Sequence, residues 1–236
     1  MAKPKGYVLQ RGISPIDGNP FVVIATMHSE NSKTGDMIQV TVLREDVDPK
    51  TAIETGDDYT VCGNCKHRKQ PDGTRSCYVD VVRMGPQKIY EAYKNKRYGE
   101  LSELDMADVQ GRKIRWGTYG DPSIIDTTLV KTFNGFAAGH TGYTHQWRQP
   151  WAQWCKGVFM ASCDSKDDYH AATEAGWKTY TVLPKQTKTV KVEPYGGKLC
   201  PYTRKDAQSK CLTCTLCSGN KVDIYIEAHG KGAKYV

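Results

Sequence analysis

The chain has 236 residues, of which 39% are hydrophobic and 25% are charged, and it carries a formal net charge of +7 at pH 7. No apolar run approaches the length of a membrane-spanning helix, which excludes an integral helical membrane protein. The first residues lack the charged and then apolar pattern of a secretory leader, so we expect a soluble, cytoplasmic protein. The length predicts one domain, or one domain with an appendage.

Basic residues are dispersed along the chain, with short clusters at residues 94–97 and 112–115 and acidic residues between many of them. A solvated surface is one explanation of this pattern. A nucleic acid or another phosphorylated partner is the alternative, because basic patches concentrate polyanions. Charge alone leaves both interpretations open.

The first 60 residues alternate and turn like a small antiparallel sheet. Residues 7–10, 21–26 and 37–43 are predicted strands, separated by glycine-, proline- and aspartate-containing turns. Asp48-Pro49 provides an N-cap with proline in the first turn, so we expect a short helix there. Residues 1–60 are therefore predicted to form an N-terminal β-meander appendage.

From residue 61 to residue 236 the pattern changes to strands and helices in alternation, and we expect a second, α/β metal-binding domain. Strands are predicted over residues 78–82, 113–117, 142–145, 157–162, 177–183 and 222–229, and helices over residues 86–93, 122–130 and 167–175. Such alternation is typical of a parallel sheet with right-handed crossovers. The predicted fold is an open parallel sheet or a partial (βα) barrel.

Polar groups follow several predicted strands, and α/β folds bind ligands at the carboxyl ends of their strands. We therefore expect Asp121, His145 and Asp164 to bind a polar ligand or to move a proton, as candidate catalytic residues. Candidate cofactor-binding positions at the same strand ends are Gly117, Gly120, Thr144 and Ser162. Helix capping is the alternative role for Asp121 and for Asp164 with the serine after it.

The nine cysteines fall mainly into two groups of metal-ligand type. A late group combines three cysteines two residues apart with a remote fourth, a spacing that iron–sulfur clusters favour. An early group precedes and follows a polar loop, and His67 is a further candidate ligand beside it. Zinc is the alternative metal, whereas disulfides fit poorly with an odd number of cysteines. The predicted metal ligands are Cys62, Cys65, Cys77, Cys200, Cys211, Cys214 and Cys217.

The order of these motifs resembles a family of phage and prophage proteins, the phage "gene product 88" proteins. The resemblance covers roughly residues 60 to 230 and rests on five motifs, which are Cys62-x2-Cys65 with Cys77-Tyr78, Ile114-Arg115-Trp116-Gly117 with Gly120-Asp121, residues 142–147, residues 160–164, and the group Cys211, Cys214 and Cys217. Such proteins look like distant relatives of the radical S-adenosylmethionine barrels.

This resemblance implies a 4Fe–4S cluster at Cys62, Cys65 and Cys77 that binds S-adenosylmethionine. It also implies a second, auxiliary 4Fe–4S cluster at the late cysteine group, and a location in the host-cell cytoplasm.

Three functions compete on these grounds. The first is an iron–sulfur enzyme of radical type that acts on a nucleotide or nucleic acid. The second is a metal-stabilised protein, with zinc or iron–sulfur, that binds nucleic acid or a host protein without catalysis. The third, a zinc hydrolase or nuclease, ranks last because the chain has no recognisable His-Glu or paired-carboxylate motif.

Overall fold

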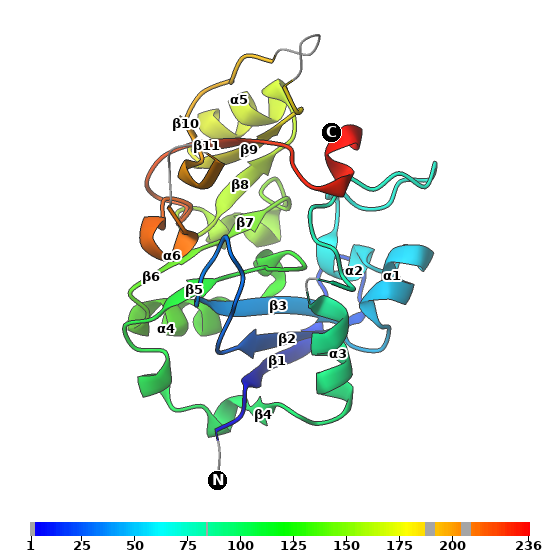
Figure 1. Ribbon diagram of the computed structural model, residues 1–236, viewed down its shortest axis with the longest axis vertical. Helices are drawn as coiled ribbons and strands as arrows, with labels where there is room; N and C mark the ends of the chain where they lie inside the picture. Colours follow the sequence, from blue (N-terminus) through cyan, green and yellow to red (C-terminus); the bar gives the residue numbers. More distant parts are fainter. Residues whose placement is uncertain (1–2, 84, 187–191, 204–208) are drawn as a thin grey trace. The chain divides into compact units, whose positions relative to one another are not determined.

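The computed structural model describes residues 3–83, 85–186, 192–203 and 209–236 (Figure 1). The chain divides into two compact units, each built from two segments. Unit 1 comprises Met1–Gly63 and Val79–His140, and unit 2 comprises Asn64–Tyr78 and Thr141–Val236. In the described part of the chain, no helix has both the length and the apolar character needed to cross a bilayer.

The predicted antiparallel β-meander is confirmed at the start of unit 1. Strands β1 (Gly6–Ile13), β2 (Pro20–Thr26) and β3 (Ile38–Arg44) pair antiparallel in chain order. However, these strands belong to a larger sheet with the order β4-β1-β2-β3-β5-β6. The added strands are β4 (Gly99–Glu100), β5 (Lys113–Arg115) and β6 (Gly139–Thr141).

The division of the chain therefore differs from the boundary predicted at residue 60. Strand β4 pairs parallel to β1 and strand β5 pairs parallel to β3, so both edges of the meander carry later strands. The meander is the centre of a six-stranded mixed sheet and not an appendage. Sequence alternation within each strand does not reveal such long-range pairing.

Local sequence signals explain the helices of unit 1. They are α1 (Pro49–Thr55), α2 (Tyr59–Cys62), α3 (Pro86–Lys94) and α4 (Thr127–Phe136), with 3-10 turns η1 (Leu101–Glu103), η2 (Met106–Asp108) and η3 (Pro122–Ile124). Asp48 caps α1 as expected, because its carboxylate accepts hydrogen bonds from the backbone N–H groups of Lys50 and Thr51, both at 3.1 Å. The helix predicted over 122–130 is instead interrupted, because Asp126 caps α4 separately by accepting from the N–H of Leu129 at 3.0 Å.

The strand predicted over residues 78–82 is wrong. These residues form bends and turns, and Val82 is 52% exposed. The carboxylate of Asp80 accepts hydrogen bonds from the backbone N–H groups of Val82 at 3.2 Å and Arg83 at 3.1 Å. An aspartate side chain that bonds the backbone in this way competes with sheet pairing.

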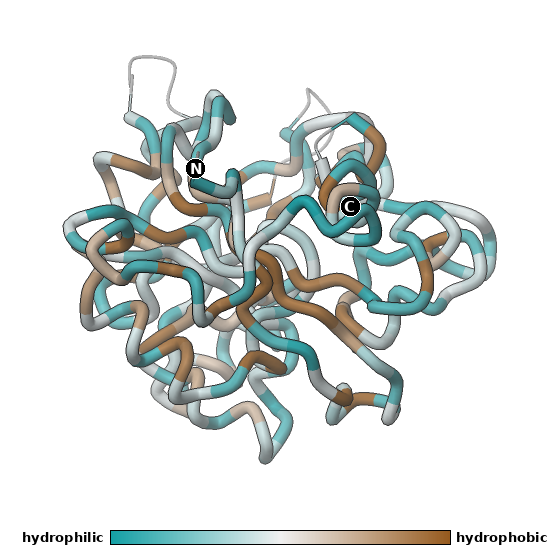
Figure 2. Tube along the Cα trace, turned by 90° about the horizontal axis from the view of Figure 1, so that it is seen from below, coloured by the Kyte–Doolittle hydropathy of each residue, from teal (hydrophilic) through white to brown (hydrophobic). Residues whose placement is uncertain are grey.

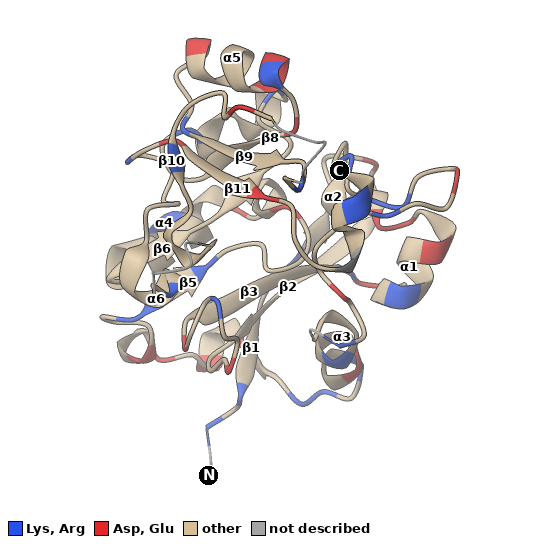
Figure 3. Cartoon of the chain, turned by 45° about the horizontal axis from the view of Figure 1, so that its top comes forward, with Lys and Arg blue, Asp and Glu red and all other residues tan. Residues whose placement is uncertain are grey.

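Hydrophobic burial holds the sheet of unit 1 in place. Strands β2 and β3 are buried along most of their length. The indole of Trp116 is also fully buried, and its N–H donates to the side-chain oxygen of Asn134 at 2.9 Å. Figure 2 shows the apolar stretches of the trace in brown, and Figure 3 shows β1, β2 and β3 largely free of charge while helices α1, α3 and α5 carry charged residues.

Unit 2 contains a five-stranded sheet with the order β10-β11-β9-β8-β7, in which all neighbouring strands are parallel. Its strands are β7 (Tyr143–Thr144), β8 (Met160–Cys163), β9 (Thr179–Leu183), β10 (Lys198–Leu199) and β11 (Ile224–Glu227). Its helices are α5 (Lys166–Glu174) and α6 (Cys211–Cys214), with 3-10 turns η4 (Pro150–Cys155), η5 (Pro201–Thr203) and η6 (Lys231–Tyr235). The prediction of an α/β fold with a parallel sheet is therefore confirmed.

Candidate metal centre

Two predicted site residues of unit 2 meet at one edge of the parallel sheet. His145 follows β7 directly and Asp164 follows β8 directly, and these strands pair in parallel with Thr144 opposite Ala161. Parallel neighbours end at the same edge of a sheet, which is where α/β folds place ligands. The Nε2 atom of His145 lies 3.3 Å from the Oδ2 atom of Asp164.

The segment Asn64–Tyr78 supplies two further metal-ligand side chains, although it precedes the sheet by many residues. It folds back on itself, because the N–H of Gln70 donates to the carbonyl of Thr74 at 2.8 Å and the N–H of Cys77 donates to the carbonyl of His67 at 2.9 Å. Gly73 allows the turn by adopting a positive φ of 82°. This return of the chain positions Cys65 and His67.

The donor atoms of His67, His145 and Asp164 converge around one point, and Cys65 lies beside His145. The Nε2 atom of His67 lies 2.9 Å from the Oδ1 atom of Asp164, and the Sγ atom of Cys65 lies 3.7 Å from the Nε2 atom of His145. Ligand atoms of His67, His145 and Asp164 all lie within 4.8 Å of one another. Among the described residues, these three side chains form the group close enough to share one ion, and Cys65 adjoins the group only through His145.

Two of these three distances agree with the edges of a tetrahedral zinc site, whereas the 2.9 Å between His67 and Asp164 is a hydrogen-bond distance. Zinc bonds of about 2.0–2.1 Å to nitrogen or oxygen and about 2.3 Å to sulfur imply ligand separations of about 3.4 Å for N···O pairs and about 3.6 Å for S···N pairs. The corresponding separations from His145 are 3.3 Å to Asp164 and 3.7 Å to Cys65. The residues present therefore fit a zinc-type ion in ligand chemistry and in the two separations measured from His145.

The environment of His67 resembles that of an oriented metal ligand. Its Nδ1 atom lies 2.7 Å from the hydroxyl oxygen of Ser76, which leaves Nε2 facing the carboxylate. Metal-bound histidines commonly donate their second ring N–H to such a partner, which fixes the tautomer and the ring orientation. The side chains of His67 and Asp164 are each 11% exposed and that of His145 is 21% exposed, so the centre is largely shielded from solvent.

Electrostatics link the carboxylate to both imidazoles. Burial raises the pKa of Asp164, but hydrogen bonds and charges from His145 and His67 outweigh it and hold that pKa well below its usual range. Burial lowers the pKa of His145, but interactions with Cys65 and Asp164 oppose it and raise that pKa well above its usual value. The two imidazoles therefore stabilise the charged form of the Asp164 carboxylate.

A catalytic Cys–His–Asp triad is a competing explanation of the same residues. In such a triad one ring nitrogen of the histidine faces the thiol and the other faces the carboxylate. Here both Cys65 and Asp164 approach the same atom, Nε2 of His145. Convergence on one nitrogen, with Nε2 of His67 added, fits ligands around an ion better than a proton relay.

The predicted cofactor-binding residues of unit 2 shape these strand ends. The hydroxyl of Thr144 accepts a hydrogen bond from the N–H of Gln146 at 2.9 Å, and the carbonyl of Ser162 accepts one from the indole N–H of Trp147 at 3.1 Å. Both residues are buried. They hold the chain around His145, and a cofactor role for them stays a prediction.

The remaining candidates at strand ends, Asp121, Gly117 and Gly120, belong to unit 1. Asp121 caps η3, because its carboxylate accepts from the N–H of Ser123 at 3.0 Å, as the capping alternative proposed. Gly117 and Gly120 have positive φ angles of 65° and 75°. A side chain at Gly120 would stand 2.5 Å from the carbonyl oxygen of Val42, so this loop needs glycine for its close approach to β3.

The predicted metal-ligand cysteines are distributed over both units. Cys62 ends α2 in unit 1, whereas Cys65 and Cys77 lie in unit 2. Cys200 and Cys217 are buried in one hydrophobic cluster, and Cys211 and Cys214 are the terminal residues of α6. An iron–sulfur cluster at these cysteines stays a prediction.

The sequence indicated His67 only as a further ligand beside the early cysteines, and it gave no sign that Ser76 would contact the His67 ring. The spacing Cys65-x-His67 was the available signal, but His145 lies 80 residues after Cys65 and Asp164 lies 97 residues after His67. Comparison with known proteins adds nothing to this geometry, since no protein family, curated protein or solved structure matches the chain. The similarity to the phage family therefore stays a prediction.

Proposed function

We propose that this is a metal-stabilised binding protein that holds one zinc-type ion through Cys65, His67, His145 and Asp164. The observation that supports the proposal most strongly is that the Nε2 atoms of both histidines face one carboxylate, at 2.9 and 3.3 Å, with a thiol beside them. A mixed set of nitrogen, oxygen and sulfur donors suits zinc.

The proposed role of the ion is structural. With Cys65 as the fourth ligand beside His67, His145 and Asp164, protein side chains would fill a tetrahedral zinc site, which is typical of structural centres. Two ligands come from the Asn64–Tyr78 segment and two from the ends of β7 and β8. The ion therefore ties this segment to the sheet of unit 2, and its binding free energy contributes to folding.

The experiment is to measure zinc and iron per chain in protein purified without added chelator, and to follow thermal unfolding before and after metal removal. We expect about one zinc ion per chain and a lower melting temperature without it. His145→Ala should lose the ion and unfold at the temperature of the metal-free protein. The matched control is His170→Ala, an exposed histidine on α5 that should retain the ion.

Equal metal content in His145→Ala and His170→Ala would overturn the proposal. Metal loss without any change in unfolding temperature would refute the structural role, and would favour a catalytic centre.

A second candidate function is an iron–sulfur protein, in which the late cysteine group (Cys200, Cys211, Cys214 and Cys217) binds the cluster while the zinc site stays as proposed. This candidate is supported by the burial of Cys200 and Cys217 among the apolar side chains of Met160, Ile224 and Ile226. Solvent exposure is one of the factors that set the properties of an iron–sulfur centre, and these two cysteines are shielded from water. In this proposal a 4Fe–4S cluster is bound by the late cysteine group. The use of S-adenosylmethionine on a barrel-like fold is inferred only from the resemblance to the phage family.

Iron and acid-labile sulfide in anaerobically purified protein test this second candidate. We expect the iron and the brown colour to disappear in Cys214→Ser while zinc remains. Colourless wild-type protein without sulfide would eliminate the iron–sulfur function and leave the zinc proposal intact.

A further inference from the structure

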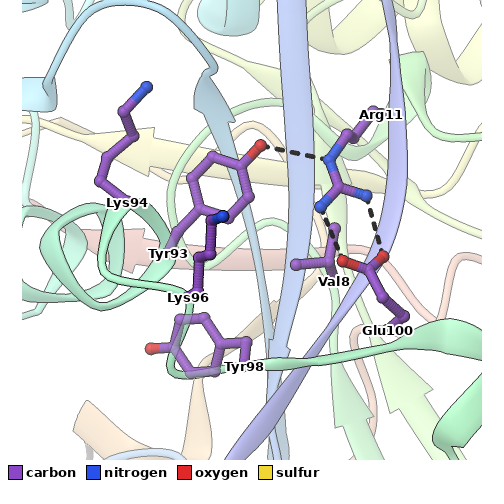
Figure 4. Close-up of a pocket in the computed structure, with 7 residues that line it drawn as sticks. All are labelled: Val8, Arg11, Tyr93, Lys94, Lys96, Tyr98 and Glu100. Atoms are coloured by element: carbon purple, nitrogen blue, oxygen red, sulfur yellow. Dashed lines mark hydrogen bonds and ion pairs between the residues drawn. The ribbon is translucent and has the colours of Figure 1, made fainter.

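Unit 1 contains a cavity that is separate in sequence from the residues of the metal centre. It has a volume of about 450 Å³, within the range of about 300–1,000 Å³ found for small-molecule sites. Its lining comes from β1, from the C-terminal end of α3 and from the chain that leads into β4 (Figure 4). The lining residues are Val8, Arg11, Tyr93, Lys94, Lys96, Tyr98 and Glu100.

One wall of the cavity is fixed by a hydrogen-bonded ion pair. The guanidinium of Arg11 donates two hydrogen bonds to the carboxylate of Glu100, at 2.8 and 2.9 Å, and a third to the hydroxyl of Tyr93 at 3.2 Å. The Tyr93 hydroxyl in turn donates to Glu45 at 2.6 Å. Arg11 is thus already neutralised, and the Tyr93 ring is held in one orientation.

Tyr98 provides a second fixed aromatic surface. Its ring packs against the backbone of Gly6, where a Cβ atom would stand 2.9 Å from the ring carbons. Burial raises the pKa of its hydroxyl, so Tyr98 is neutral at physiological pH. Two rigid tyrosines therefore line the cavity, and aromatic faces of this kind stack on planar ligands at low entropic cost.

Two lysines supply positive charge that the cavity itself does not neutralise. Lys94 and Lys96 are exposed, and in the described part of the chain neither forms a salt bridge within 4.0 Å. The ammonium group of Lys94 lies 5.7 Å from the centroid of the Tyr90 ring, which is outside the cavity lining. Lys96 also adopts a positive φ of 53°, a conformation that disfavours side chains other than glycine and asparagine. In Figure 4 its side chain stands between the rings of Tyr93 and Tyr98.

We propose that this cavity binds a nucleoside phosphate, with the base stacked on tyrosine and the phosphate held by Lys94 and Lys96. Aromatic stacking platforms combined with basic side chains are the means by which proteins bind single-stranded nucleic acids without sequence preference. Figure 3 shows basic positions in blue on the chain that follows α3, and both basic and acidic positions on α3 itself. The ligand is either a free nucleotide or one nucleotide of a single strand.

The experiment measures binding of AMP, adenosine and a fluorescein-labelled ten-nucleotide single strand to the full chain by titration calorimetry and fluorescence anisotropy. The double variant Lys94→Gln/Lys96→Gln should weaken AMP binding by about tenfold or more and leave adenosine binding nearly unchanged. Tyr98→Leu should weaken both ligands by roughly tenfold to a hundredfold, since stacking contributes about 1–3 kcal/mol per base. The control is Lys88→Gln, which removes one positive charge from an exposed lysine on α3 outside the cavity.

The two sources of the ligand give different results. A free-nucleotide site binds AMP at least as tightly as the oligonucleotide, whereas a strand-binding site prefers the oligonucleotide and loses affinity steeply as salt increases. Absence of binding by all three ligands would overturn the proposal, as would equal losses in the double variant and in Lys88→Gln. The measurement is independent of the metal centre, because all four proposed ligands of that centre lie in unit 2.

Discussion

The hydrogen bond between Ser76 and His67 provides a sensitive test of the metal centre, because Ser76 contributes no metal ligand itself. Its hydroxyl oxygen lies 2.7 Å from the Nδ1 atom of His67. The change Ser76→Ala removes this partner, so the imidazole loses the contact that selects its tautomer and fixes its ring. Loss of such a partner typically reduces metal affinity by about 10- to 100-fold. This corresponds to about 1.4–2.8 kcal/mol of binding free energy.

Competitive titration of the metal-free protein with zinc and a chromogenic chelator measures this affinity. The control is Ser218→Ala, which removes a serine hydrogen bond of similar length in the same unit, donated to Asn220 at 2.9 Å. Ser76→Thr keeps the hydroxyl and should restore much of the affinity. The reasoning is refuted if Ser76→Ala binds zinc as tightly as the wild type, or if the control loses as much affinity.

Three further predictions concern the stability of each unit and its dependence on pH. Asp121→Ala should cost about 1 kcal/mol of unfolding free energy in a denaturant titration, because it removes a cap, and metal content should not change; loss of metal would contradict the capping role. Gly142→Ala should destabilise by about 1–3 kcal/mol, since the new Cβ would stand 2.4 Å from the ring of Phe159, and an unchanged melting temperature would count against that packing. Metal-free protein should melt at a higher temperature at pH 5.5 than at pH 8.5, and zinc-loaded protein should show the reverse order.

The sign of the pH effect follows from the two shifted pKa values. The raised pKa of His145 gives stability that is complete below the unfolded value, about 6.5, and is lost as pH rises through the higher folded value. The lowered pKa of Asp164 gives stability that is complete above about 3.9 and is lost as pH falls through the lower folded value. Both contributions are complete between these two pH values. Zinc reverses the order because protons compete with the ion for the same atoms.

The sequence by itself determined the features that depend on neighbouring residues. Asp48 and Asp121 cap their helical turns because a carboxylate can bond backbone N–H groups only two or three positions ahead. The three strands of the meander also follow from the local sequence, in which apolar stretches are separated by turns that contain glycine, proline or aspartate. The same reasoning placed His145 and Asp164 at strand ends, because a strand's end can be read from the residues beside it.

Only the tertiary structure decided which of these elements meet. The chain brings the ring of His67 to within 2.9 Å of Asp164, 97 residues later, and joins β1 to β4 across the intervening helices. No local pattern encodes these contacts, since they depend on which apolar surfaces pack together once the whole chain is folded. The same dependence explains the error at residues 78–82, where the alternation of apolar residues predicted a strand but the Asp80 side chain bonds the backbone into a turn.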